Sequence, residues 1–226
     1  MIELGLGAVE ALSQPGTGRV VGTYRKAAYL RVPGGLFALT TPDVPSGPLH
    51  ARTDIDVTRL RVGDRVTVTP TLLEAGPLLV DLRHARTWQG EYADVGAGSI
   101  DLPGLCELAA RLGGRGQGLT PAGDDRLAGI LLVARMFGGP DAEADLVAIA
   151  SSVRTNDIAR AFLVWAARGQ CIEPAHRYLA TGRDEALADL IAVGHSSGTE
   201  LANGLSWGAR NIALHQGASV RATAVQ

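Results

Sequence analysis

Aromatic residues and cysteines are scarce in this sequence, and their scarcity excludes several protein classes. Phenylalanine, tryptophan and tyrosine make up 4% of the 226 residues, so aliphatic side chains must build the core. The two cysteines, Cys106 and Cys171, stand far apart, which excludes a disulfide framework and a zinc knuckle. We expect both to be buried free thiols in helices. No basic stripe accompanies the net charge of −2, which argues against a nucleic-acid partner.

Signals for membrane insertion and export are also lacking. No apolar run approaches the ~20 residues that a membrane-spanning helix requires. The first residues, 1–5, have neither the basic segment nor the long apolar core of a secretory signal. We therefore expect a cytoplasmic protein with no membrane partner. A length of 226 residues allows one large domain or two small ones.

The first half of the chain has the pattern of a β-rich module, which we place at residues 1–95. Short runs of β-prone residues alternate with glycine, proline and charged turn residues. The predicted strands cover residues 19–24, 27–32, 36–40, 65–69 and 78–82. Many short strands at close spacing are typical of a small barrel or a sandwich.

The second half, residues 96–226, has the pattern of an α-helical bundle. The predicted helices cover residues 102–112, 124–137, 141–153, 155–168, 173 onward, 184–193 and 198–215. The helix over 124–137 is almost entirely apolar after its first turn, so we expect it to be central and buried. Trp165 and Trp207 stand at helical positions and are predicted to lie in the core. The predicted fold class is thus α+β, with a β-rich barrel or sandwich followed by a helical domain.

The most informative segment is the loop before the central helix, with the sequence GQGLTPAGDD. Glycines let a backbone turn sharply and approach a ligand closely, and the N–H groups at a helix start favour an anion. Two adjacent carboxylates suit a metal such as Mg²⁺ or a proton transfer, and an elaborate helix cap is the alternative. The loop lacks the lysine of a phosphate-binding P-loop and does not follow a strand, so a nucleotide is not indicated. The candidate residues here are Gly116, Gly118, Thr120, Gly123, Asp124 and Asp125.

Two other predicted helix starts carry more polar residues than capping needs. Before the last helix, His195 could shuttle a proton or bind a metal, and Ser196 or Ser197 could act as a nucleophile. Near residue 155, Arg154 could pair with an anion beside Thr155. Plain capping is the alternative at both places. If the three helix starts converge, they form one polar pocket.

These motifs resemble those of a known bacterial family. The loop matches the hallmark G-x-G-L-T-P-[SA]-G-D-D of a family of uncharacterised proteins that includes AllH, a subunit associated with oxamate carbamoyltransferase in allantoin degradation. Thr155 and the GHSSG segment at 194–198 fall where this family has further polar motifs. Two positions differ: Arg126 stands where the family usually has an aromatic residue, and Glu200 stands near a usual aspartate.

The resemblance implies a carbamoyltransferase-type enzyme subunit of purine nitrogen catabolism, with partner subunits and a small anionic substrate such as oxamate. In that reading the amides of Gly116, Gly118 and Gly123 hold a phosphate and His195 protonates the carbonyl or the leaving group. Asp124 positions the nucleophilic amine or a Mg²⁺ ion, while Asp125 orients it or caps the helix. Two alternatives remain: a non-catalytic ligand-binding or assembly subunit, and a metal-dependent hydrolase that uses both aspartates and the histidine.

Overall fold

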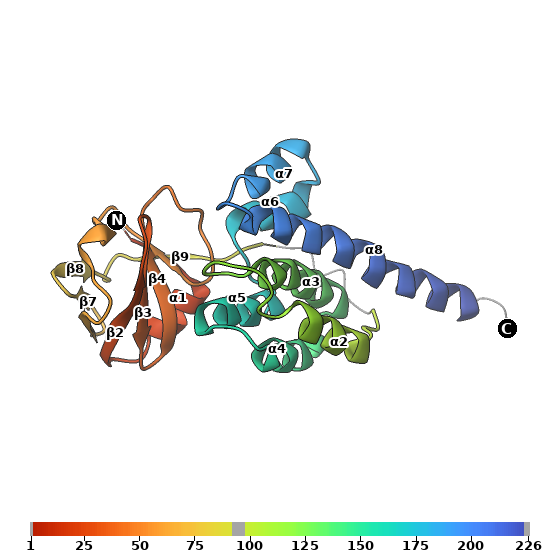
Figure 1. Cartoon of the computed structure of the whole chain (residues 1–226), viewed down its shortest axis with the longest axis horizontal. Coiled ribbons are helices and arrows are strands. Elements are labelled where there is room, and N and C mark those ends of the chain that lie inside the picture. Colours follow the sequence, from red (N-terminus) through yellow and green to blue (C-terminus); the bar gives the residue numbers. More distant parts are fainter. Residues whose placement is uncertain (1, 92–97, 224–226) are drawn as a thin grey trace. The chain divides into compact units, whose positions relative to one another are not determined.

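The computed structural model describes the backbone of residues 2–91 and 98–223, with side chains up to Ile212. The chain divides into two compact units, an N-terminal unit (Met1–Gly90) and a helical unit (Glu91–Gln226) (Figure 1). The predicted fold class, β-rich and then α-helical, is confirmed. In the described part of the chain, no helix is long and apolar enough to cross a membrane.

A nine-stranded sheet forms the N-terminal unit, in the order β8-β7-β6-β2-β3-β4-β5-β1-β9. Its strands are β1 (Glu3–Gly5), β2 (Gly16–Thr23), β3 (Ala27–Val32), β4 (Gly35–Thr40), β5 (His50–Arg52), β6 (Arg65–Val68), β7 (Leu72–Ala75), β8 (Leu78–Asp81) and β9 (Arg86–Trp88). Neighbouring strands are antiparallel except for the parallel pairs β4–β5 and β1–β9. The sheet curls into a half-barrel, so the barrel is the better of the two predicted architectures.

The core of this unit lies between the sheet and a short helix that the sequence pattern did not predict. Val20, Leu30 and Phe37 are fully buried on β2, β3 and β4. Helix α1 (Leu6–Leu12) packs on β4 and β1 and buries Ala8. A single 3₁₀ turn, η1 (Val57–Arg59), leads from β5 toward β6.

Seven α-helices and one 3₁₀ turn form the described part of the helical unit. They are α2 (Leu102–Leu112), α3 (Ala122–Gly138), η2 (Pro140–Ala142), α4 (Glu143–Ser152), α5 (Asp157–Ala167), α6 (Glu173–Thr181), α7 (Asp184–Ile191) and α8 (Ser197–Thr223). Helix α3 is buried on all sides, as its apolar sequence predicts, and it packs on α8, α5, α4 and α2. Helix α8 is longer than predicted and runs along α3 (Figure 1).

Glycines allow α3 and α8 to pack backbone against backbone. A Cβ atom on Gly204 would lie 2.0 Å from the carbonyl oxygen of Arg126, and one on Gly129 would lie 2.4 Å from that of Leu201. Real Cβ atoms do not approach backbone this closely, so both positions require glycine while the helices keep this spacing. The contact fixes the start of α3 beside the start of α8.

Three predictions about single side chains are wrong. Cys106 lies in α2 as predicted but is exposed, while Cys171 is buried as predicted but lies in the connection before α6. Trp207 was expected in the core, yet it is 37% exposed on α8. It lines an open pocket between α2 and α8 and is not part of the packed contact with α3. Helical periodicity does not say which of these positions an aromatic residue takes.

Candidate functional site

The loop between α2 and α3 depends on its glycines for conformation and for close contact. Gly114, Gly116 and Gly118 have φ angles of +68°, +119° and +100°, a region that other residues rarely adopt. A Cβ atom on Gly114 would also lie 2.6 Å from the carbonyl oxygen of Arg154, whereas Gly118 faces open space. The loop therefore lies directly against the segment that precedes α5.

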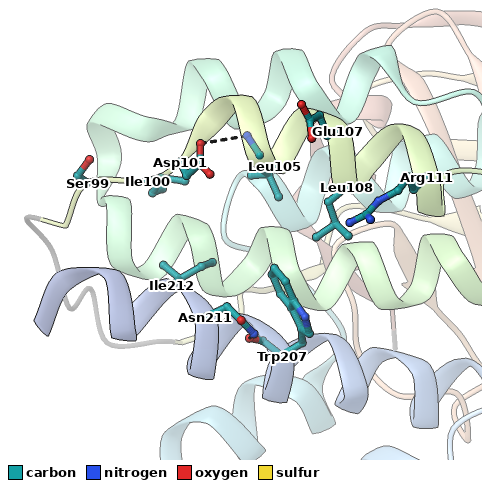
Figure 2. Close-up of a pocket in the computed structure, with 11 residues that line it drawn as sticks. Ser99, Ile100, Asp101, Leu105, Glu107, Leu108, Arg111, Trp207, Asn211 and Ile212 are labelled. Carbon is teal, nitrogen blue, oxygen red and sulfur yellow. Dashed lines mark hydrogen bonds between the residues drawn. The ribbon is translucent and has the colours of Figure 1, made fainter. Parts of the chain in front are cut away.

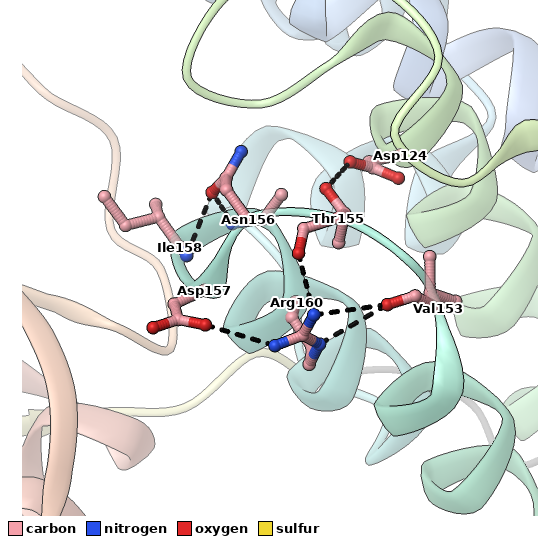
Figure 3. A network of polar contacts seen from close by, with 8 residues as sticks. Asp124, Val153, Thr155, Asn156, Asp157, Ile158 and Arg160 are labelled. Atoms are coloured by element: carbon pink, nitrogen blue, oxygen red, sulfur yellow. Dashed lines mark hydrogen bonds and ion pairs between the residues drawn. The ribbon is translucent and has the colours of Figure 1, made fainter.

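Asp124 holds this loop in place from the first turn of α3. Its side chain is 2% exposed, and its Oδ1 accepts a hydrogen bond of 2.8 Å from the N–H of Gly114. Its Oδ2 accepts a hydrogen bond from the hydroxyl of Thr155 (Figure 3). Because one donor lies in the loop and the other before α5, Asp124 joins the loop, α3 and the segment before α5. We call this junction the corner.

Asn156 ties the same segment to the loop a second time. Its Oδ1 caps α5 by accepting from the N–H groups of Ile158 and Ala159, and its Nδ2 donates to the carbonyl oxygen of Leu119 at 2.9 Å. Behind it, the guanidinium of Arg160 donates to the carbonyl oxygen of Thr155 at 2.7 Å (Figure 3). The segment before α5 thus both caps that helix and connects it to the loop before α3.

Asp125 contacts other residues than Asp124 does. We call Thr120, Asp125 and Ser197 the Asp125 cluster. The hydroxyl of Thr120 donates to Asp125 Oδ2 at 3.2 Å and lies 3.2 Å from Ser197 Oγ at the start of α8. Burial raises the pKa of Asp125 to about 6, against the lowering effect of hydrogen bonds from Ser197 and Thr120. The charges of Asp124 and Glu200 add to the rise.

The two positions that depart from the family pattern pair with each other. Arg126 Nε donates to Glu200 Oε2 at 2.8 Å, and a terminal nitrogen of the same guanidinium lies 2.6 Å from that oxygen. The pair joins the first turn of α3 to the first turn of α8. Arg126 is therefore neither a free cation in the site nor a purely solvated side chain.

The three polar helix starts do converge, although not every predicted residue takes part. The segment around Thr155 and the start of α8 each reach the loop, through Asp124 and through the Asp125 cluster. His195 and Ser196 lie exposed in the turn before α8, and within the described residues the His195 side chain makes no hydrogen bond. Arg154 is also exposed beside the corner. The catalytic and binding roles suggested for these residues stay predictions.

A free row of backbone donors runs along the exposed loop. In the described part of the chain, no acceptor faces the N–H groups of Gly116, Gln117, Gly118 and Leu119. Consecutive free N–H groups in a glycine-rich turn are typical of concave anion sites. This feature fits the predicted use of Gly116 and Gly118, whereas the N–H of Gly123 donates to the carbonyl oxygen of Arg115 at 2.7 Å.

Metal binding finds less support at this site. Among the described residues, no group of three or more histidine, cysteine or acidic side chains is placed to hold a metal ion. Each oxygen of Asp124 already accepts one hydrogen bond, from the N–H of Gly114 or from the hydroxyl of Thr155, so an ion would have to share these oxygens with the donors. The suggested Mg²⁺ ligand role of Asp124 thus competes with its structural one.

Sequence reasoning missed two functional features of this corner. The sequence pattern does not single out Asn156, because its bridging contact is with Leu119, 37 residues away in the sequence. Glu200 was noted only as a departure from a pattern, and its opposite charge to Arg126 was the available signal for their pairing. Contacts of this kind depend on tertiary structure, which spacing alone does not give.

Comparison with known proteins gives one family. Residues 112–209 match the model of a family described as oxamate carbamoyltransferase subunit AllH, so the resemblance predicted from the motifs is confirmed over this stretch. The matched residues all lie in the helical unit and include the loop, the Asp125 cluster and the segment around Thr155. No solved structure matches the chain.

Proposed function

We propose that this chain is a subunit of a carbamoyltransferase-type enzyme, and that Asp125 is its proton-transfer group. The family description names a subunit of oxamate carbamoyltransferase and supports the reaction class. The observation that carries the site is the Asp125 cluster, where a carboxyl with a pKa of about 6 faces two hydroxyls at the junction of α3 and α8. A base with a pKa near the working pH combines the ionised form with useful basicity.

The reaction would transfer a carbamoyl group from carbamoyl phosphate to the amide nitrogen of oxamate. The nitrogen forms a bond to the carbamoyl carbon, and the bond from that carbon to the phosphate oxygen breaks. The nitrogen loses a proton, which Asp125 accepts in its ionised form. The hydroxyls of Thr120 and Ser197 orient the Asp125 carboxylate. Their hydrogen bonds also stabilise its negative charge before it accepts the proton.

The free donors of the loop supply a place for the phosphate. The N–H groups from Gly116 to Leu119 have no protein acceptor in the described residues, and Arg154 presents an exposed guanidinium near the same corner. Backbone dipoles fixed before the reaction stabilise developing negative charge without having to reorganise. The predicted role of His195, proton donation to the leaving group, stays a prediction for this exposed side chain in the turn before α8.

In this proposal Asp124 is a positioning residue, which reverses the roles suggested by the sequence. Its two hydrogen bonds, from Gly114 and Thr155, fix the loop that carries the free N–H groups. The carboxylate of Asp125 instead contacts the hydroxyls of Thr120 and Ser197. The chemistry therefore depends on Asp125, and the shape of the site depends on Asp124.

A non-catalytic assembly role is the second candidate, and the exposure of the corner favours it. Residues 114–118, Arg154 and His195 all lie at the surface of the helical unit. A partner subunit could cover them and supply the remaining catalytic groups. In that case the chain binds the ligand or the partner and performs no proton transfer of its own.

Thermal-shift titration of the full chain tests the proposed anion site. The ligands are phosphate, carbamoyl phosphate and oxamate, on the wild type and on Arg154→Gln and Asp125→Asn. A ligand at about 100 times its Kd should stabilise the protein by ~2.7 kcal/mol, a shift of roughly 5–10 °C for a domain of this size. Arg154→Gln should weaken the response to both phosphate ligands, and Asp125→Asn should leave the response to phosphate alone unchanged.

Asn203→Ala, an exposed site on α8, is the matched control and should respond as the wild type does. If none of the three ligands shifts the transition, the anion site is wrong for the isolated chain. If shifts appear only after a partner subunit is added, the assembly role is supported instead.

A further inference from the structure

A second pocket lies between α2 and α8 and takes no part in the proposed reaction. It encloses about 280 Å³ (Figure 2). Trp207 lines it, ten residues after Ser197 on α8, which places it roughly 15 Å along the helix at a rise of 1.5 Å per residue. The pocket is therefore a separate place on the helical unit.

An indole ring forms one wall of this pocket. Trp207 is 37% exposed and rises from α8 toward α2 (Figure 2). Leu105 and Leu108 of α2 and Ile212 of α8 line the space around it. An open aromatic face with aliphatic neighbours favours a flat, apolar ligand body, because ring contact removes apolar surface from water.

A free cation stands at the same pocket. The guanidinium of Arg111 is exposed and, among the described residues, has no ion-pair partner. Glu107 is four residues earlier on α2, a spacing that permits an ion pair, yet the two are not paired. In Figure 2 the Glu107 carboxylate points away from Trp207. A guanidinium in this position can bind a ligand carboxylate through two parallel hydrogen bonds.

The other polar groups are partly engaged. Asp101 Oδ1 accepts the N–H of Gly104 at 3.0 Å and so caps α2. Asn211 Nδ2 donates to the carbonyl oxygen of Trp207 at 2.8 Å, which leaves its Oδ1 for a donor on a ligand. Asp101 thus has a structural role, and Glu107 points away from Trp207. Arg111 is the charged residue that lines the pocket beside the indole ring.

The backbone that carries Trp207 is fixed by its neighbours. A Cβ atom on Gly204 would meet the carbonyl oxygen of Arg126, and one on Gly208 would lie 2.9 Å from the Cβ of Val133. Helix α8 therefore cannot shift against α3 without loss of packing. A wall held in place before binding reduces the entropy that a ligand must overcome.

We propose that this pocket binds a small aromatic carboxylate, with its ring against Trp207 and its carboxylate on Arg111. Such a ligand matches the one open aromatic face and the one unpaired cation that the pocket presents in the described residues. The inference does not rest on the proposed carbamoyl transfer, because neither residue belongs to the Asp125 cluster.

Fluorine NMR of the full chain with 4-fluorobenzoate tests this site. We expect a saturable shift or broadening of the probe signal on titration with protein. Arg111→Gln and Trp207→Ala should each raise the Kd about tenfold or more, as expected for the loss of a charge-assisted hydrogen bond or of an aromatic contact. The neutral probe 4-fluorobenzamide should bind about tenfold more weakly to the wild type, and equally to wild type and Arg111→Gln.

Matched controls separate this pocket from other causes. Arg210→Gln, an exposed arginine of α8, and Asp125→Asn should both leave the Kd for 4-fluorobenzoate unchanged. Circular dichroism should show that Arg111→Gln is folded as the wild type is. The proposal is overturned if the probe gives no saturable signal, if Arg111→Gln binds it equally well, or if the benzamide binds as tightly as the benzoate.

Discussion

Asp124 and Asp125 are adjacent in sequence but face different partners. Successive residues of an α-helix point about 100° apart. Asp124 therefore turns to the loop and accepts from Gly114 and Thr155, while Asp125 turns to α8 and the hydroxyls of Thr120 and Ser197. Both oxygens of the first carboxylate accept a hydrogen bond, whereas the second is ionised at a cost in stability.

Replacement of Asp125 by asparagine should stabilise the helical unit at pH 8. Burial raises the folded-state pKa of Asp125 from 3.8 to about 6. The folded state then holds the proton more tightly than the unfolded state, so stability present below pH ~4 is lost as the pH rises to about 6. At 1.36 kcal/mol per pKa unit, the variant should be more stable by up to about 3 kcal/mol above that range. Chemical denaturation at several pH values measures the difference.

Asp124→Asn provides the contrast at the neighbouring position. The variant places an NH₂ group against a donor, so it should destabilise the protein by about 1–3 kcal/mol. Buried His176, whose pKa burial lowers to about 4, titrates in the same range, so each variant is compared with wild type at the same pH. A difference between Asp125→Asn and wild type that is the same at pH 4 and pH 8 would contradict the assignment.

At the residue scale, the sequence predicted the proximity of the site residues more successfully than it predicted their individual roles. The motifs placed Thr155, Ser197 and both aspartates near one another, and contacts join them all. The different roles of Asp124 and Asp125 could not be predicted, because Thr155, the donor to Asp124 Oδ2, lies 31 residues away in the sequence. His195 illustrates the opposite case: its residue type suggested chemistry, yet it lies in an exposed turn.

Among the elements, α3 and α8 decide the geometry of the site. Gly129 and Gly204 let their backbones touch, and Arg126 and Glu200 pair across their first turns. This contact sets Asp125 of α3 beside Ser197 of α8. A small change in the spacing of the two helices would separate the carboxyl from its hydroxyl.

Gly204→Ala should destabilise the helical unit although alanine favours helices. The new Cβ would lie 2.0 Å from the carbonyl oxygen of Arg126, and overpacking of this kind costs about 1–3 kcal/mol. Asn203→Ala, the exposed neighbour on α8, should change stability by less than about 0.5 kcal/mol. Thermal unfolding of both variants measures the contrast. Equal melting temperatures would show that the two helices do not pack this closely.

Long periodic segments were predictable and short ones were not. The apolar run of α3 and the alternation in β6 gave their elements within a few residues. Strands β1, β5 and β9 have three residues each, too few for a period of two to be recognised. Helix α1 follows β1 without a turn signal, and its burial against β4 comes from tertiary packing.

For the whole molecule, the family match and the candidate site belong to the same unit. The match covers residues 112–209, within the unit Glu91–Gln226. The curled sheet of the N-terminal unit carries none of the residues of the Asp125 cluster. The family description speaks of a subunit, which supports the proposal that other chains complete the enzyme.

The most direct test is the rate of carbamoyl transfer to oxamate by the complex purified with a tag on this chain. The rate is measured from pH 5 to pH 9 for wild type and Asp125→Asn, with Asn203→Ala as control. We predict that the wild-type rate rises through an apparent pKa near 6 and that Asp125→Asn loses about 10²–10⁴-fold, as expected for a lost general base. A variant complex that keeps both the rate and the pH profile of the wild type would contradict a catalytic role for Asp125.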